Sequence, residues 1–305
     1  MRSLTVLILA VMVSITWGTT WMAMKIAVET IPPVFATGLR FVFAAPFLIC
    51  IAWITKAPLL FPPGQRIFQL GICIFYFAIP FSLMIYGETH IGSGLASIIF
   101  ANMPVAILIA SMILLKNRTN AVQIIGLAMS TTSLVVILFN ESKTTVGPHW
   151  PGILALVAAV IIHAITYAQC KKISCDVSVI TFNALPCLCA GLMLSIVGWV
   201  AESPRISGIS KISILSTLYL GVFAGVFGIL CYFSLQKRAS PFQASLVFLI
   251  FPLVAVSLES YVYGNSLALN SIYMTIPLAV GILITLFSQH LYCDNKTKKL
   301  PCDGP

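Results

Sequence analysis

Long apolar stretches alternate with short polar links along almost the whole chain of 305 residues. The apolar stretches cover 4–24, 34–54, 67–87, 92–114, 121–139, 151–169, 178–200, 212–234, 242–262 and 272–291. Each is roughly 19 to 23 residues long, which is what an α-helix needs to cross a hydrocarbon core of about 30 Å. The pattern predicts an all-α polytopic membrane protein with ten transmembrane helices. No link is long enough to fold into a catalytic or ligand-binding domain.

The composition agrees with a lipid environment. Apolar residues make up 59% of the chain and charged residues 8%, whereas charged residues are about a quarter of an ordinary soluble protein. A soluble fold of this length has too little interior to bury so many apolar side chains. The lipid bilayer is therefore the expected partner of most of the surface.

The net charge of +9 would suit nucleic acid, but the positions of the basic residues argue against it. If the N-terminus is cytoplasmic, the cytoplasmic side carries twelve basic residues: Arg2, Lys56, Arg66, Lys116, Arg118, Lys171, Lys172, Lys237, Arg238, Lys296, Lys298 and Lys299. The opposite side carries four: Lys25, Lys143, Arg205 and Lys211. This positive-inside bias predicts cytoplasmic N- and C-termini in a bacterial inner membrane, with no nucleic-acid partner.

The two halves of the chain resemble each other. The segment 17–25, Trp-Gly-Thr-Thr-Trp-Met-Ala-Met-Lys, aligns with 163–171, His-Ala-Ile-Thr-Tyr-Ala-Gln-Cys-Lys, at an offset of 146. The proline-centred segments 101–105 and 249–253 align at an offset of 148. We therefore expect two copies of one unit.

The expected copies are 1–140 and 141–291, followed by a cytoplasmic tail at 292–305. Five spans per copy is an odd number, so the second copy must enter the membrane from the opposite side. Inverted repeats of this kind are typical of secondary transporters, which alternate between two openings around a midplane site. The sequence thus predicts a transporter of a small-molecule substrate and not an enzyme.

Several of these features together resemble a known family. The Trp17-Gly18 pair, the segment 39–41 (Leu-Arg-Phe), Pro104, Pro252 and the five-plus-five plan are similar to the EamA branch of the drug/metabolite transporter superfamily. The resemblance covers residues 4–291 and rests on the order and spacing of its motifs. It implies a ten-helix exporter of small metabolites with a cavity between the halves.

The chain departs from the family at one place. Relatives commonly have a glutamate about thirteen residues after each proline, whereas Asn117 and Asn265 stand there in this chain. If that glutamate couples or gates transport in relatives, this protein uses other residues.

Glu259 is the most prominent ionisable residue inside a span, seven residues after Pro252. Ionisable groups within spans are costly and frequently functional. Glu259 is our coupling candidate, either exchanging a proton or pairing with a cationic substrate group. The alternative is a structural carboxyl hydrogen-bonded to a neighbouring helix.

Arg40 lies near the start of the second span and matches the family's arginine. It would bind a substrate carboxylate or anchor the helix, either by snorkelling to the interface or by pairing with Glu29 or Glu88. We expect Glu88 and His90 to lie in a solvated turn at the end of the third span.

Two aromatic-polar faces occupy matching positions in the first and sixth spans. Residues of these faces with helical spacing are Trp17, Thr20, Trp21, His163 and Tyr167. Such faces suit a cavity for flat or amphipathic solutes. Ordinary helix packing, with His163 bonded to a backbone carbonyl, is the alternative.

Proline marks two expected helix breaks, at Pro104 and Pro252. Asn102 precedes the first and would bond either a freed carbonyl or substrate. Tyr86 and Tyr232, near the ends of their spans, complete the expected cavity wall.

The motifs of other protein classes are missing from the sequence. It contains no nucleotide-binding G-x-x-x-x-G-K-[ST] and no H-E-x-x-H, and its cysteines lack metal-ligand spacing. We therefore expect no cofactor and no metal. The predicted function is export of amino acids or related amphipathic solutes by alternating access, with protons as one driving force. A non-transporting sensor or assembly factor, an intramembrane enzyme, and the choice between monomer and dimer remain alternatives.

Overall fold

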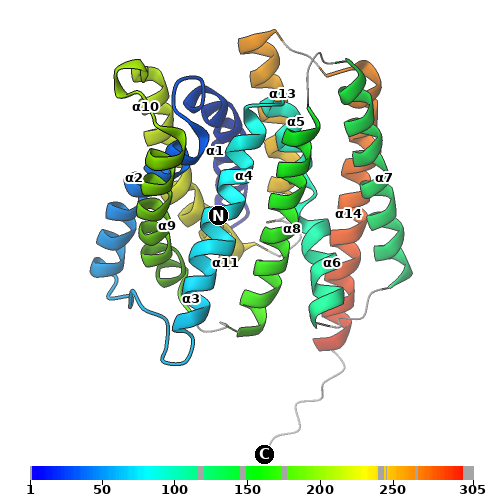
Figure 1. The fold of residues 1–305 in the computed structure, drawn as a ribbon. Helices are drawn as coiled ribbons and strands as arrows, with labels where there is room; N and C mark the ends of the chain where they lie inside the picture. The colour runs from blue at the N-terminus through cyan, green and yellow to red at the C-terminus, as the bar shows by residue number, and fades with distance from the viewer. Residues whose placement is uncertain are drawn as a thin grey trace, which may run out of the picture.

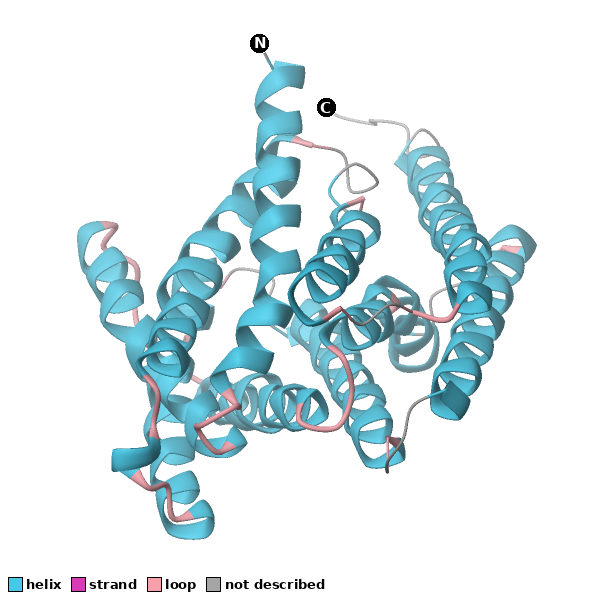
Figure 2. Ribbon diagram, turned by 90° about the horizontal axis from the view of Figure 1, so that it is seen from above, coloured by secondary structure: helices cyan, strands magenta, loops and turns pink. Residues whose placement is uncertain are grey.

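The computed structural model describes residues 2–115, 120–144, 149–173, 177–239, 244, 246–264 and 267–297. These residues form helices and connecting loops, with no strand in the described ranges (Figure 2). The α-helices of the first half are α1 (Arg2–Ala27), α2 (Pro33–Ile54), α3 (Arg66–Ile72), α4 (Ile79–Glu88), α5 (Ser93–Ala101), α6 (Met103–Leu115) and α7 (Ala121–Thr144). Those of the second half are α8 (Trp150–Ile173), α9 (Val179–Glu202), α10 (Lys211–Leu218), α11 (Gly228–Arg238), α13 (Val247–Tyr263) and α14 (Leu269–Thr297).

These helices confirm the predicted architecture. Eight continuous helical stretches are long and apolar enough to cross a membrane, and Val247–Tyr263 and Leu269–Thr285 are two shorter apolar helices. All ten coincide with the predicted spans. The chain is therefore an all-α polytopic membrane protein. Only the start of the ninth predicted span, at 242–243 and 245, lies outside the described residues.

Two spans contain a π-helical stretch that sequence periodicity did not predict. In the third span, η1 (Cys73–Ala78) joins α3 to α4, and in the eighth, η3 (Tyr219–Phe227) joins α10 to α11. Their first residues, 73 and 219, differ by 146, which is the offset found between the aligned sequence segments. A π-turn shifts backbone carbonyls out of the regular hydrogen-bond pattern and is frequent at functional sites.

Most of the large helix contacts join one half of the chain to the other. Along their lengths, α2 packs against α9, and α7 against α14 (Figure 1). Likewise α1 packs against α13, and α4 against α8. The largest buried cluster contains Trp21, Met24, Ile99, Leu156 and Phe251, which come from both halves. The core of the molecule is therefore the interface between the halves.

The two ends of the helix bundle differ in charge. The connections 28–32, 89–92 and 203–210 lie at one end, and the connection 55–65 lies at the other (Figure 1). The ends of α1, α4, α7, α9 and α13 lie at the first end (Figure 1). We call it the glutamate end, because all the glutamates of the chain lie at or within a few residues of these helix ends: Glu29, Glu88, Glu141, Glu202 and Glu259. Lys56, Arg66, Lys237 and Arg238 lie at the other end, which we call the basic end.

Candidate functional site

A continuous set of aromatic rings connects the two halves in the middle of the bundle. We call this set the aromatic path: Tyr232, Trp17, Phe248, Phe251, Trp21, Phe100, His163 and Phe81. Ring centroids lie 4.7 Å apart for Trp17 and Tyr232, and 5.0 Å apart for Trp21 and Phe100. At the other end of the path, Phe81 and His163 are 5.3 Å apart. The structure thus brings together Trp17, Trp21, His163 and Tyr232 as the sequence predicted.

Arg40 lies at the Phe81 end of the aromatic path. Its guanidinium carbon is 4.8 Å from the centroid of the Phe81 ring, and Nη1 donates to the Met24 sulfur at 3.6 Å. No carboxylate among the described residues lies within ion-pair distance of this group. Arg40 is 7% exposed, so the alternative of a snorkelling anchor is wrong. Its helix is covered by α9 and η3, and Gly221 of η3 lies directly against the Arg40 carbonyl.

His163 bonds a carbonyl of the first π-helix. Its Nε2 lies 3.0 Å from the carbonyl oxygen of Tyr76, and Thr166 Oγ1 donates to the Phe75 carbonyl at 3.1 Å. A backbone carbonyl partner is what the packing alternative gave for His163, and the role of His163 in lining a cavity stays a prediction. Sequence reasoning missed Tyr76 and Phe81, because their contact with His163 depends on the packing of the third span against α8.

Asn102 forms the turn between α5 and α6, so the predicted break beside Pro104 is confirmed. Its Nδ2 donates to the Ile98 carbonyl at 3.2 Å, whereas its buried Oδ1 has no hydrogen-bond partner. The side chain lines a mostly apolar cavity of about 140 Å³ between α5, α6, α7 and α8. The predicted break at Pro252 is wrong, since α13 continues through it. Pro252 is only five residues from the start of α13, so the intrahelical bond it removes is close to the helix end.

The other predicted wall residues lie away from the aromatic path. Tyr86 is exposed and stacks on His90 with centroids 4.6 Å apart. Tyr167 is also exposed, and interacts electrostatically with Tyr232. The Thr20 hydroxyl bonds the Trp17 carbonyl of its own helix. Asn117 and Asn265 lie outside the described residues.

Glu259 belongs to a buried polar cluster at the glutamate end. Its Oε2 accepts the Gly94 backbone N–H at 2.6 Å, at the first turn of α5. Nearby, Lys25 Nζ donates to the Ile91 carbonyl at 3.0 Å. Lys25 and Glu259 are the charged neighbours of Glu88. The halves therefore meet here through α1, α4, α5 and α13.

Glu88 is the unexpected member of this cluster. It is 1% exposed, and neither of its carboxyl oxygens has a hydrogen-bond partner. The predicted solvated turn is therefore wrong for Glu88. The helix α4 continues through Glu88 and packs so closely on α8 that a side chain at Gly87 would collide with Leu156. Burial of this kind depends on tertiary packing and leaves no local signal in the sequence.

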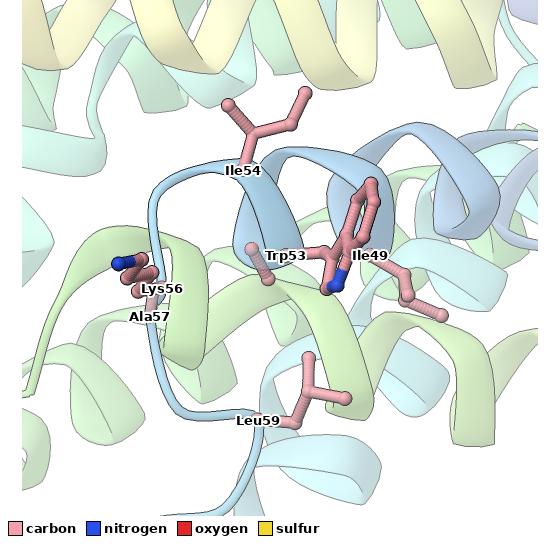
Figure 3. A pocket seen from close by; sticks show the side chains of 7 residues that line it. Ile49, Trp53, Ile54, Lys56, Ala57 and Leu59 are labelled. Carbon is pink, nitrogen blue, oxygen red and sulfur yellow. The ribbon is translucent and has the colours of Figure 1, made fainter.

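A separate open pocket of about 670 Å³ lies at the basic end, beside the C-terminus of α2 (Figure 3). Its wall consists of Ile49, Ala52, Trp53, Ile54, Lys56, Ala57 and Leu59. Trp53 is 82% exposed, and a tryptophan beside a lysine at a span end is typical of the membrane–water interface. We assign this pocket to the lipid-facing surface.

Comparison with known proteins gives the family context of this site. The EamA-like transporter family model matches twice, at 4–139 and at 150–287. "Protein PagO" of Salmonella typhimurium is 65% identical over 95% of this chain and 96% of its own length. An "Uncharacterized transporter" of Buchnera aphidicola is 54% identical over 96% of this chain and 97% of its own length. A solved crystal structure with 19% identity covers 95% of this chain and 99% of its own, with a TM-score of 0.66, and shows the same fold.

Proposed function

Because the chain belongs to the EamA-like transporter family, we propose that it is a secondary transporter that exports carboxylate-bearing organic solutes, such as amino acids, by alternating access. Membership makes it a multi-pass membrane transporter. The inner-membrane location agrees with the "Uncharacterized inner membrane transporter YedA" of Escherichia coli, which is 26% identical over 83% of this chain and 81% of its own length. The substrate class, the direction and the mechanism are our proposals.

The buried guanidinium of Arg40 is the observation that supports a carboxylate substrate. A buried arginine normally pairs with an acidic group, since an unpaired charge in a membrane interior is costly. Arg40 contacts instead a sulfur atom and an aromatic ring. The planar guanidinium can bond both oxygens of a carboxylate at once. A substrate carboxylate would therefore supply the partner that the described residues do not.

The aromatic path supports an apolar or flat side chain on the same solute. It begins beside Arg40 at Phe81 and continues through His163, Phe100 and Trp21 across the interface of the halves. Aromatic faces interact well with apolar groups and with other rings. An amino acid with a bulky apolar or aromatic side chain presents both features. Asn102, whose Oδ1 is unpartnered, directly follows α5, two residues after Phe100.

In alternating access, the two halves of the chain would move against each other at the interface where they pack. Four long helix pairs join the halves, and at the glutamate end the joining groups are polar. We propose that rocking of one half on the other opens this end to the outside. Opening would separate the carboxylate of Glu259, our coupling candidate, from the Gly94 N–H and expose the polar groups of this end to water. This exposure would couple the movement to protons.

Flux through proteoliposomes tests the substrate class. We expect wild-type protein to carry leucine or phenylalanine, but not the corresponding amines that lack the carboxyl group. Arg40→Gln should reduce amino-acid flux by at least about tenfold, the equivalent of one charge-assisted hydrogen bond. Arg66→Gln is the matched control, since Arg66 is exposed at the basic end, and it should keep wild-type flux. Equal transport of acids and amines, or full activity of Arg40→Gln, would contradict a carboxylate site at Arg40.

A further inference from the structure

The carboxyl group of Glu88 is buried at the glutamate end without a bonding partner. Neither oxygen accepts a hydrogen bond, although water would bond both if the group were exposed. An ionised carboxylate in such a place loses its hydration and gains nothing in exchange. A carboxylic acid that has bound a proton is neutral and avoids this cost.

The charged groups around Glu88 come from several helices. Lys25 on α1 and Glu259 on α13 act on it directly. Tyr263, also on α13, interacts with Glu88, Glu259 and Glu29, and its hydroxyl donates to Glu29 at 2.6 Å. His90 follows α4, with Nδ1 2.8 Å from the Thr89 hydroxyl, and His149 precedes α8, with Nδ1 2.8 Å from the His90 carbonyl. Arg40 on α2 contacts the Met24 sulfur and the Phe81 ring instead of this cluster.

Of the two glutamates in this cluster, Glu259 is the one whose carboxylate has a hydrogen-bond donor. It accepts the Gly94 N–H at the first turn of α5, where unpaired backbone donors favour an anion. Lys25 supplies one positive charge, and it is held in place by the Ile91 carbonyl. The single positive charge of Lys25 can neutralise only one of the two glutamates. The second carboxylate, on Glu88, has neither a donor nor a cation left to neutralise it.

We propose that Glu88 is the proton-binding site of the outer gate. The gate consists of Lys25, Glu88, Glu259 and the Ile91–Gly94 segment, and it is closed when Glu88 carries its proton. On opening, water reaches Glu88, the O–H bond breaks, and the proton passes to the external solution as the carboxylate becomes hydrated. This inference rests on the proposed transport function, and it separates the roles of the two acids: Glu259 is the fixed anion and Glu88 the group that exchanges the proton.

The proposal links gate opening to external pH. Low pH should favour the closed gate and high pH the open one, because opening releases a proton. One released proton changes the opening equilibrium by up to about tenfold per pH unit. Glu88→Gln is neutral at every pH, so its gate should stay closed and lose the dependence. Glu88→Asp retains a carboxyl group, so its gate should keep the dependence on pH.

Thiol labelling of the gate tests this directly. Ala27→Cys places a reporter at a fully buried position two residues after Lys25, and a membrane-impermeant maleimide added outside measures its exposure. Thr30→Cys, at an exposed position, corrects for the reagent's own dependence on pH. Site-specific mass spectrometry distinguishes the reporter from the native cysteines. Glu29→Gln, which removes an exposed carboxylate at the same end, is the matched control.

We expect the corrected labelling rate to rise with pH in wild type, Glu29→Gln and Glu88→Asp, and to stay low and flat in Glu88→Gln. A Glu88→Gln rate that rises like wild type, or that is high at every pH, would overturn the proposal. A Glu88→Asp labelling rate that does not change with pH would also overturn the proposal. This second variant keeps the test decisive if Glu88→Gln fails to fold. A flat wild-type rate in protein that still transports amino acids would reject the proton site alone. If the wild-type protein transports no amino acid, the proposed function itself is rejected.

Discussion

At the scale of single residues, several polar side chains inside the bundle bond backbone carbonyls. Thr166, His163 and Gln69 bond carbonyls of neighbouring segments. Arg40 and Glu88 are buried, and neither contacts a counter-ion in the part of the chain that the structure describes. The sequence identified Arg40 because charged residues in spans are rare. It misjudged Glu88, because a residue at a span end is buried or exposed according to the helix that packs beside it.

Glu202 illustrates a bonded group whose role can be tested. It ends α9, and its two carboxylate oxygens accept the Val34 and Phe35 backbone N–H groups at 3.0 and 2.9 Å. These donors belong to the first turn of α2, whose N-cap residue Pro32 offers no side-chain bond. Glu202 therefore caps a helix from the other half of the chain.

We expect Glu202→Ala to lower the free energy of unfolding by about 1–2 kcal/mol, as loss of a helix cap does. Chemical unfolding of the detergent-purified protein, followed by circular dichroism, measures this change. Glu202→Gln keeps one acceptor oxygen and should lose less. Equal stability of wild type and Glu202→Ala would contradict the capping role.

At the scale of the helices, the sequence predicted the spans well because the membrane requires long apolar helices and little else forms there. The break at Asn102 was also predictable, since Pro104 cannot donate a backbone hydrogen bond. The π-helices at 73–78 and 219–227 were not, because apolar residues on every side leave no periodicity to read. Their positions depend on partners such as Thr166 on a distant helix.

The pairing of α7 with α14 depends on small residues facing each other. A side-chain carbon added at Gly126 would lie 2.7 Å from the Gly281 carbonyl oxygen and 2.6 Å from Thr285 Oγ1. The two helices approach this closely because glycine has no side chain, as is common between helices in membranes. Overpacking the contact would push the helices apart.

Gly126→Ala should destabilise the protein by about 1–3 kcal/mol through this collision. The matched control is Gly71→Ala, where nothing lies within 4 Å of the added carbon. There the better helix propensity of alanine should leave stability unchanged or slightly raised. Thermal melting of both variants in the same detergent makes the comparison, and a Gly126→Ala protein as stable as Gly71→Ala would contradict the close packing.

At the scale of the whole molecule, the plan of two copies is a prediction from the sequence. Aligned motifs separated by about 146 residues predicted two copies, and the family model matches 4–139 and 150–287 separately. The way in which the copies fit together was not predictable. The aromatic path and the Lys25–Glu88–Glu259 cluster combine residues from helices far apart in sequence. The cytoplasmic location of both termini stays a prediction from the distribution of basic residues.

We propose that this chain carries a solute across the membrane and couples that movement to protons. Radiolabelled amino-acid flux in proteoliposomes, with and without a pH gradient, tests it most directly. We predict saturable wild-type flux that the gradient accelerates. Glu259→Gln should keep the flux without the acceleration, since Lys25 and Glu88 would then balance each other without a proton. If no solute moves in a protein-dependent manner, the transporter account is contradicted and a non-transporting sensor takes its place.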